Sequence, residues 1–236
     1  MQIKAISQHT PVYTINYFGL HKTKLSFVEG YCASLKNVAL DSTAIEKTVR
    51  FFKTLPSFSN VTYSTEPYDN GYVLNLFFEE NKTFLPAATA FRSINGVSVR
   101  TAASENNFLG RNISISGFYQ YNNYHSYYIG IKAPYLFNKS TGIEINNQNL
   151  NSLEPLYIAN ESAIYRYQLT NIEVLLIKTI RLRHMIKAGI SFFKDDYQIF
   201  SKFQTQNSFK EDVMLRKRSN KAVSYTHLTL PTKRIV

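Results

Sequence analysis

The chain has 236 residues, of which 44% are hydrophobic and 14% aromatic, and its formal net charge is +11. This length allows one or two domains, and the apolar content excludes a disordered chain. The most apolar stretch, 172–180, contains Glu173 and Lys178, so no segment offers the ~20 apolar residues of a transmembrane helix. Any membrane span must therefore be a β-barrel.

Lysine and arginine are scattered singly along the chain, apart from the run at 216–218, and this scatter favours solvated charge over nucleic-acid binding. Cys32 is the only cysteine, which excludes an internal disulfide and argues against a zinc site. The chain has no Gly-x-Ser-x-Gly or His-Glu-x-x-His motif, and its five histidines are far apart. We therefore expect no enzyme, no cofactor, no metal site and no nucleic-acid partner.

Residues 13–80 are patterned as strand, helix, helix, strand and strand. Gly19 ends the first strand, Asp41 is a capping signal for the second helix, and Pro56 should stop that helix. The pair Asn70-Gly71 indicates a tight hairpin between the last two strands. The expected strands are 13–18, 61–65 and 72–78, and the two apolar helix faces are Leu25, Val28, Cys32 and Leu35, and Ile45, Val49, Phe52 and Leu55.

This module resembles a POTRA domain, the repeated periplasmic module of outer-membrane assembly proteins. In the most specific of the matching segments, Pro56 would end the helix and Phe58 would fill the gap between helix and sheet. Asn60 would close the following turn. An unrelated small α+β fold with the same connectivity is the alternative. The matching segments are Gly19–Thr23, Leu55–Val61 and Val73–Glu80.

Residues 83–200 read as antiparallel strands near the length that crosses a bilayer at a tilt. A change of face near Asn171 indicates a bulge. Apolar and polar residues alternate, so one face should meet lipid and the other the lumen, although a soluble sandwich would alternate too. The seven expected strands are 84–94, 97–103, 112–121, 125–134, 141–149, 163–180 and 184–197. The expected outward residues are Ile113, Ile115, Ile129, Ile131, Ile143, Ile145, Ile186 and Ile190, and the lumenal ones are Ser114, Lys132, Glu144 and Lys187.

Two motifs in this module resemble the barrel of the BamA and TamA group. The run Ile131–Phe137 matches a recurrent strand-ending Pro-Tyr of that group, and a second motif matches the turn after the second barrel strand. The resemblance covers 13–197 and implies an α+β POTRA domain at 13–80, followed by the N-terminal part of an antiparallel transmembrane β-barrel of the surface-antigen type at 83–200. The residues of the second motif are Asn107, Phe108, Leu109, Gly110, Arg111 and Asn112.

The resemblance also implies a location and an orientation. The protein would lie in the bacterial outer membrane with its POTRA domain in the periplasm. The turns at Asn107–Arg111, Tyr135–Ser140 and Arg181–Arg183 would then be periplasmic. The connections at Asn95-Gly96, Asn122-Asn123 and Leu150–Asn160 would be external.

By the same resemblance, the protein folds β-barrel clients into the outer membrane. Its partners would be unfolded clients, outer-membrane lipid and periplasmic accessory proteins. The edge of the POTRA sheet would add a client strand through backbone hydrogen bonds. The first barrel strand would pair weakly with the last and open to template a client, and Pro86 removes one hydrogen-bond donor from it. The residues of this expected seam are Phe84, Leu85, Pro86, Ala87, Ala88, Thr89, Ala90 and Phe91.

Only about the first seven of the ~16 strands of such a barrel fit the sequence. Residues 1–12 read as a linker or the end of a preceding repeat without a signal peptide, and 201–222 as a loop or a further strand. Residues 223–236 resemble a translated sequencing adaptor. We therefore expect an internal fragment, and a two-partner secretion transporter or the membrane-anchoring barrel of a patatin-like lipase remain alternatives.

Overall fold

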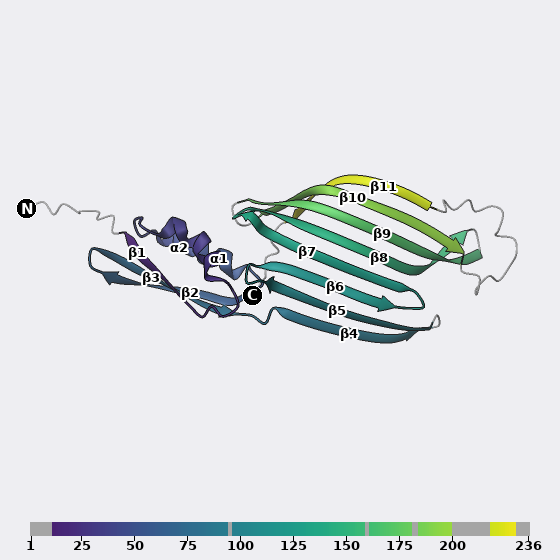
Figure 1. Cartoon of the computed structure of the whole chain (residues 1–236), viewed down its shortest axis with the longest axis horizontal. Helices are drawn as coiled ribbons and strands as arrows, with labels where there is room; N and C mark the ends of the chain where they lie inside the picture. The colour runs from purple at the N-terminus through teal and green to yellow at the C-terminus, as the bar shows by residue number, and fades with distance from the viewer. Residues whose placement is uncertain (1–10, 94–95, 159–160, 181–183, 200–217, 230–236) are drawn as a thin grey trace, which may run out of the picture. The chain divides into compact units, whose positions relative to one another are not determined.

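The computed structural model describes residues 11–93, 96–158, 161–180, 184–199 and 218–229, which form two compact units (Figure 1). The first unit contains the chain up to Thr83 together with the separate segment Asn106–Ile113. The second unit contains Phe84–Glu105 and the chain from Ser114 onward. The segment Asn106–Ile113 thus belongs to the first unit, although the strand residues before and after it belong to the second.

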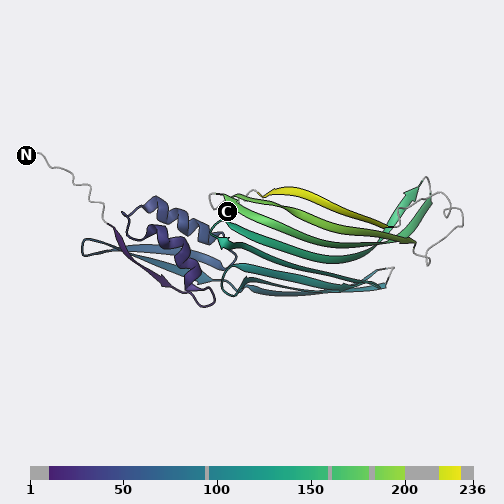
Figure 2. The ribbon, with the colours of Figure 1, turned by 45° about the horizontal axis from the view of Figure 1, so that its top comes forward.

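The first unit has the strand, helix, helix, strand, strand order that the sequence pattern predicts. Its sheet has the order β1-β3-β2, with β1 parallel to β3 and β2 antiparallel to β3. Two helices and a short 3-10 turn cover one face of this sheet (Figure 2). The elements are β1 (Val12–Phe18), α1 (Leu25–Cys32), η1 (Ala33–Leu35), α2 (Ser42–Lys53), β2 (Phe58–Tyr68) and β3 (Gly71–Glu80).

An aromatic cluster forms the centre of the first unit. Phe52 of α2, Phe58 of β2 and Phe78 of β3 are all buried, and the ring centroids of Phe58 and Phe78 lie 5.0 Å apart. Phe58 therefore fills the gap between helix and sheet as predicted. The Asp41 side chain accepts hydrogen bonds from the backbone N–H groups of Thr43 and Ala44 at the start of α2, which confirms the predicted cap.

Two local predictions for the first unit are wrong. Leu25, the first residue of α1, is exposed, and Tyr31 is buried together with Val28 and Cys32. Asn60 does not close a turn. It lies within β2, and its side chain accepts a hydrogen bond from the neighbouring Val61 N–H at 2.9 Å.

The second unit is one antiparallel sheet whose eight strands follow the order of the chain. Within the described residues, β4 and the last strand are its two edges, and the sheet is not closed into a barrel. Neither described helix of the chain is long and apolar enough to cross a membrane. The strands are β4 (Phe84–Ser93), β5 (Gly96–Phe108), β6 (Ile113–Tyr121), β7 (His125–Asn138), β8 (Thr141–Ile158), β9 (Glu161–Ile180), β10 (His184–Ile199) and β11 (Arg218–Thr229).

Three features of this sheet differ from the sequence-based expectation. The predicted bulge near Asn171 is wrong, because β9 pairs with β8 and β10 without a register shift. The predicted external connection at Leu150–Asn160 is wrong over most of its length, because β8 pairs with β9 as far as Ile158. The sheet also has an eighth strand, β11, which includes residues 223–229 of the suspected tail. The turn at 181–183 and Asn95 lie outside the described residues.

Candidate functional site

The motif turn between β5 and β6 is fastened to the first unit by buried polar side chains. Asn107 is almost fully buried. Its Nδ2 donates to Thr23 Oγ1 at 2.9 Å, and its Oδ1 accepts from the backbone N–H of Asn112 at 2.9 Å. Ser57, also buried, donates through Oγ to Asn112 Oδ1 at 3.0 Å. We call the turn Asn107–Asn112 and its partners Thr23 and Ser57 the clasp.

Gly110 allows the closest approach in the clasp. Its carbonyl oxygen accepts a hydrogen bond from Lys24 N at 2.9 Å. Its φ angle is +67°, in the left-handed region, and a Cβ added there would lie 2.3 Å from the carbonyl oxygen of Lys22. A side chain at this position would therefore be strained by both conformation and contact. The clasp requires glycine here for two independent reasons.

Glu80, at the end of β3, binds the loop between β1 and α1 that contains Lys22 and Thr23. Its two carboxylate oxygens accept hydrogen bonds from the backbone N–H groups of Lys22 and Thr23, at 2.8 and 2.7 Å. Burial disfavours the charged form of Glu80, but the hydrogen bonds from Thr23 and Lys22 outweigh it and lower the pKa of this carboxyl below its ordinary value. Glu80 therefore fixes the loop that carries Thr23 to the clasp.

β4, the expected seam strand, is paired on one side only. It pairs with β5 from Phe84–Glu105 to Ser93–Gly96, and as the edge of the sheet it has no second neighbour among the described strands. The pair Ser93–Gly96 closes the hairpin, so Ser93 and every second residue before it direct their N–H groups toward β5. Pro86 belongs to the alternate residues, whose backbone nitrogens face the free edge. A strand tolerates proline at such a position, because no hydrogen bond within the sheet is lost.

β2 is the corresponding free edge in the small sheet, and α2 runs beside it. A groove of about 380 Å³ lies between them. Of its lining residues, Val49 and Val61 are buried and Tyr63 is half-buried. The residues that line the groove are Glu46, Val49, Arg50, Lys53, Val61, Thr62 and Tyr63.

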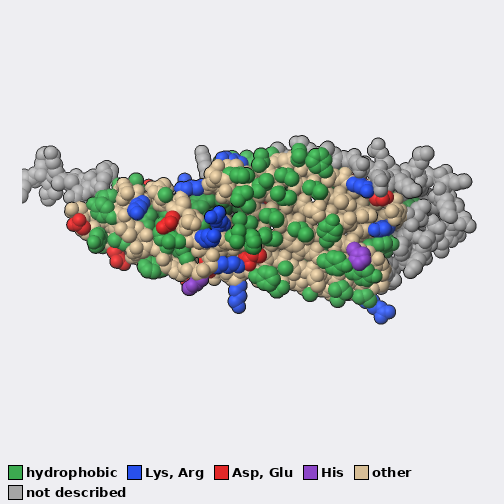
Figure 3. All heavy atoms as spheres, in the orientation of Figure 1, with side chains coloured by type: hydrophobic (Ala, Val, Ile, Leu, Met, Phe, Trp, Pro, Cys, Tyr) green, Lys and Arg blue, Asp and Glu red, His purple; other side chains and the backbone are tan. Residues whose placement is uncertain are grey.

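One face of the large sheet exposes rows of apolar side chains. The most uniform row crosses five strands, because each member is paired with the next in the sheet register. Figure 3 shows hydrophobic side chains gathered over the middle of the large sheet. Ile131, Ile145 and Ile190 in the row are exposed. The row is Ile115, Ile131, Ile145, Val174 and Ile190.

The opposite face carries polar and charged side chains. Ser114, Lys132 and Glu144 are register neighbours there, and Lys187 Nζ lies 2.6 Å from Glu144 Oε2 with both side chains largely covered. Asn146 donates to Glu173 at 2.8 Å. The predicted division of the faces is confirmed for Ile129, Ile131, Ile145 and Ile190, which are exposed, while Ile113, Ile115, Ile143 and Ile186 are half-buried.

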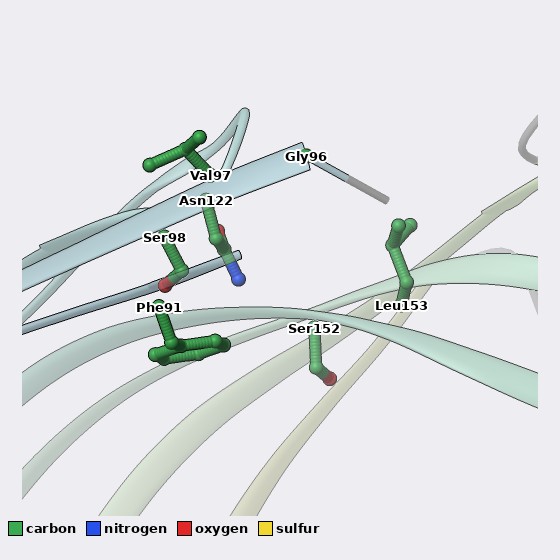
Figure 4. A pocket seen from close by; sticks show the side chains of 7 residues that line it. All are labelled: Phe91, Gly96, Val97, Ser98, Asn122, Ser152 and Leu153. Atoms are coloured by element: carbon green, nitrogen blue, oxygen red, sulfur yellow. The ribbon is translucent and has the colours of Figure 1, made fainter. Parts of the chain in front are cut away.

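A cavity of about 240 Å³ lies at the β4–β5 end of the same sheet (Figure 4). Two polar atoms at its lining, Ser98 Oγ and Asn122 Oδ1, are buried without a hydrogen-bond partner. The lining residues carry no charged side chain, so they offer no general acid or base. The lining residues are Phe91, Gly96, Val97, Ser98, Asn122, Ser152 and Leu153.

The sequence-derived candidate residues thus fall in two places. The turn Asn107–Asn112 belongs to the first unit, where it forms the clasp, and Phe84–Phe91 lies on the free edge of the second unit. Sequence patterns did not predict that Thr23 and Ser57 are partners of the clasp, or that Glu80 fixes the loop containing Thr23. No local signal could have found them, since Thr23 and Asn107 are 84 positions apart. Among the described residues, no three His, Cys, Asp or Glu side chains are grouped so that they could hold a metal ion.

No protein-family model matches the chain, and no curated protein matches it. Solved structures do match its fold. The crystal structure of BamA from Haemophilus ducreyi lacking POTRA domains 1–3 superposes with a TM-score of 0.56 at 15% identity, covering 93% of this chain and 42% of that shortened chain. CdiB from Escherichia coli superposes with a TM-score of 0.55 at 10% identity, covering 93% of this chain and 42% of CdiB.

This chain therefore spans less than half the length of either structure. At these identities the likeness concerns the fold alone. The described strands have the fold of part of a BamA-type β-barrel protein.

Proposed function

We propose that this chain is part of an outer-membrane protein assembly factor. In this proposal the first unit is a periplasmic POTRA domain and the second is the N-terminal part of a transmembrane barrel. The observation that carries the proposal is the exposed apolar row through Ile131, Ile145 and Val174, which lies opposite a covered polar face. A soluble sandwich would bury the apolar face, whereas a membrane barrel turns it toward lipid.

The height of the apolar face fits a bilayer. On β9, Lys178 and Thr170 border the exposed side chains of Ile172, Val174 and Leu176. The stretch from Lys178 to Thr170 is about 26 Å long at ~3.3 Å per residue. At the ~40° tilt of barrel strands it would cover about 20 Å across the membrane, near the ~25 Å apolar band of outer-membrane barrels. Beside Thr170 the outward row becomes polar or aromatic, with Asn149 on β8 and Tyr127 on β7.

Two free edges would carry the work on clients. β2 would capture an extended client segment in the periplasm by adding it as a fourth strand to the small sheet. β4 would then template the first strand of the client at the membrane, because its free edge presents unpaired backbone groups. Backbone pairing depends little on side chains, and this would let one factor accept many clients.

The test is folding of a urea-denatured outer-membrane barrel into liposomes that contain this chain, followed by protease protection. We expect the chain to accelerate folding. Ala88→Pro removes an N–H from the free edge of β4 and should abolish most of the acceleration, while Ala88→Val retains the donor and should keep it. Equal folding rates with empty liposomes, or equal rates for the two variants, would rule out templating by β4.

A two-partner secretion transporter is the second candidate, and the fold likeness to CdiB favours it. Such a transporter would pass an unfolded polypeptide through the lumen instead of inserting it sideways. The same liposomes distinguish the two functions. Client that becomes protease-protected and soluble inside the liposomes indicates transport, whereas client that is protected and membrane-integrated indicates assembly.

A further inference from the structure

The groove between α2 and β2 has a charged rim on one side. Glu46, Arg50 and Lys53 are spaced by four and three residues, so they form one stripe along α2. The same groove is lined by Tyr63 of the edge strand. A strand added to β2 would therefore place every second side chain near Tyr63 and the charged stripe.

The free edge of β2 is short. The Val61 N–H donates to the Asn60 side chain and not to β3, so the N–H groups of Val61 and every second residue after it point toward the free edge. Tyr63 and Thr65 supply the next two outward N–H groups. Pro67, the following outward residue, has none. Because the Val61 N–H is already bonded to Asn60, the available window extends from Tyr63 to Thr65 and would pair a segment of about three residues.

The charge of the rim is mainly positive. Arg50 Nη2 lies 3.4 Å from Glu46 Oε2, but the two side chains are 77% and 54% exposed. Such a solvated ion pair contributes little to stability. An anionic group of a client could therefore replace Glu46 as the partner of Arg50 at a small free-energy cost. Lys53 lies one turn further along the stripe and has no acidic counterpart among the groove residues. The rim therefore carries one more positive than negative charge.

We propose that this groove selects extended client segments that carry an acidic side chain two residues from an apolar one. The apolar side chain packs on Tyr63, which is half-buried, and the carboxylate lies between Arg50 and Lys53. The period of two follows from strand geometry, since residues i and i+2 lie on the same face. This inference rests on the proposed strand-capturing role of β2 and adds to it the chemistry of the preferred client.

The test uses the full chain in detergent and fluorescein-labelled peptides whose binding is measured by fluorescence anisotropy. One peptide carries valine and aspartate two positions apart, and a second carries lysine in place of aspartate. We expect the aspartate peptide to bind about threefold to tenfold more tightly, because each exposed ion pair contributes modestly. The preference should shrink as NaCl rises from 50 to 500 mM, because salt screens exposed charges.

Variants separate the selectivity from the strand capture. Arg50→Glu combined with Lys53→Glu should remove or reverse the preference, while the control Lys47→Glu, on an exposed residue of α2 outside the groove, should leave it intact. An aspartate peptide N-methylated at alternate positions should not bind. Unchanged preference in the double variant would overturn the acidic selectivity but leave strand capture standing. Equal binding of the methylated peptide would overturn strand capture itself.

Discussion

The first unit has an aromatic core between its helices and its sheet, whereas the second exposes rows of apolar side chains on one face of its sheet. In the first unit, Phe52 and Phe58 are 0% and 3% exposed and pack between helix and sheet. In the second, Ile129 and Phe192 are 55% and 56% exposed and lie on the outer rows of the sheet. Extended exposed apolar surface indicates a partner or a membrane. This difference is the one that the proposed function requires, with the first unit in water and the second meeting lipid on one face.

The largest effect should come from the core of the first unit. Phe58→Ala removes a ring that contacts Phe52 and Phe78 and should lower the free energy of unfolding by about 3–5 kcal/mol. Urea unfolding followed by circular dichroism at 222 nm includes the helix signal of this unit, because both described helices belong to it. The control is Phe91→Ala on an exposed ring. Equal midpoints for the two variants would mean that Phe58 is not in a core.

A charge placed on the apolar row should have the second largest effect. Ile131 belongs to the apolar row that crosses five strands. Ile131→Arg should destabilise the membrane-embedded chain by about 2–4 kcal/mol near the bilayer midplane. Ser114→Arg, on the opposite face, should be tolerated. Urea unfolding in liposomes, read by protease protection, measures both. If the two variants lose equal stability, the contrast between the faces is not a contrast between lipid and lumen.

The clasp should have an intermediate effect on the first unit. Gly110→Ala introduces a Cβ 2.3 Å from the Lys22 carbonyl oxygen at a φ of +67° and should cost about 1–3 kcal/mol. Asn107→Ala leaves its buried hydrogen-bond partners unsatisfied and should also lower the free energy of unfolding by about 1–3 kcal/mol. Phe108→Ala, on an exposed side chain, is the control. Unchanged unfolding of the helical signal in both clasp variants would show that the turn is not part of the first unit.

The smallest effect should be a pH dependence carried by Glu80. Its pKa in the folded chain is lowered, so the stabilisation that it provides is present above its unfolded pKa and is lost as the pH falls through the folded value. Unfolding midpoints at 222 nm should therefore decrease on acidification from pH 6 toward pH 3, and Glu80→Gln should flatten that decrease. A variant that loses stability on acidification as steeply as the parent chain would assign the effect to other carboxyl groups.

Sequence alone predicted those features that depend on neighbouring residues. The stripe of Ile45, Val49 and Phe52 and the cap at Asp41 are local, because helix period and capping act within a few positions. Strand alternation likewise placed Ile129 and Ile131 on the exposed face. These patterns carry their own geometry, so no tertiary information was needed.

The features that failed depend on partners far away in the chain. β8 continues past Asn149 because β9 offers pairing partners up to Glu161, and the same unbroken pairing removes the expected bulge at Asn171. The clasp depends on Thr23 meeting Asn107, and the groove depends on β2 being an edge of its sheet. Sheet order and side-chain contacts over such separations have no signature in a single sequence.

The most direct test of the proposed contact with lipid is cysteine labelling of positions on the two faces of β7 and of the neighbouring strand β6. In a Cys32→Ala background reconstituted in liposomes, Ile129→Cys and Ile131→Cys should react with a lipid-soluble maleimide and not with a charged, water-soluble one. Lys132→Cys and Ser114→Cys should react with the water-soluble reagent. Alternating reactivity along β7 is the result that the account predicts. If all four positions react alike with the water-soluble reagent, the apolar rows do not meet lipid, and the assembly role fails with them.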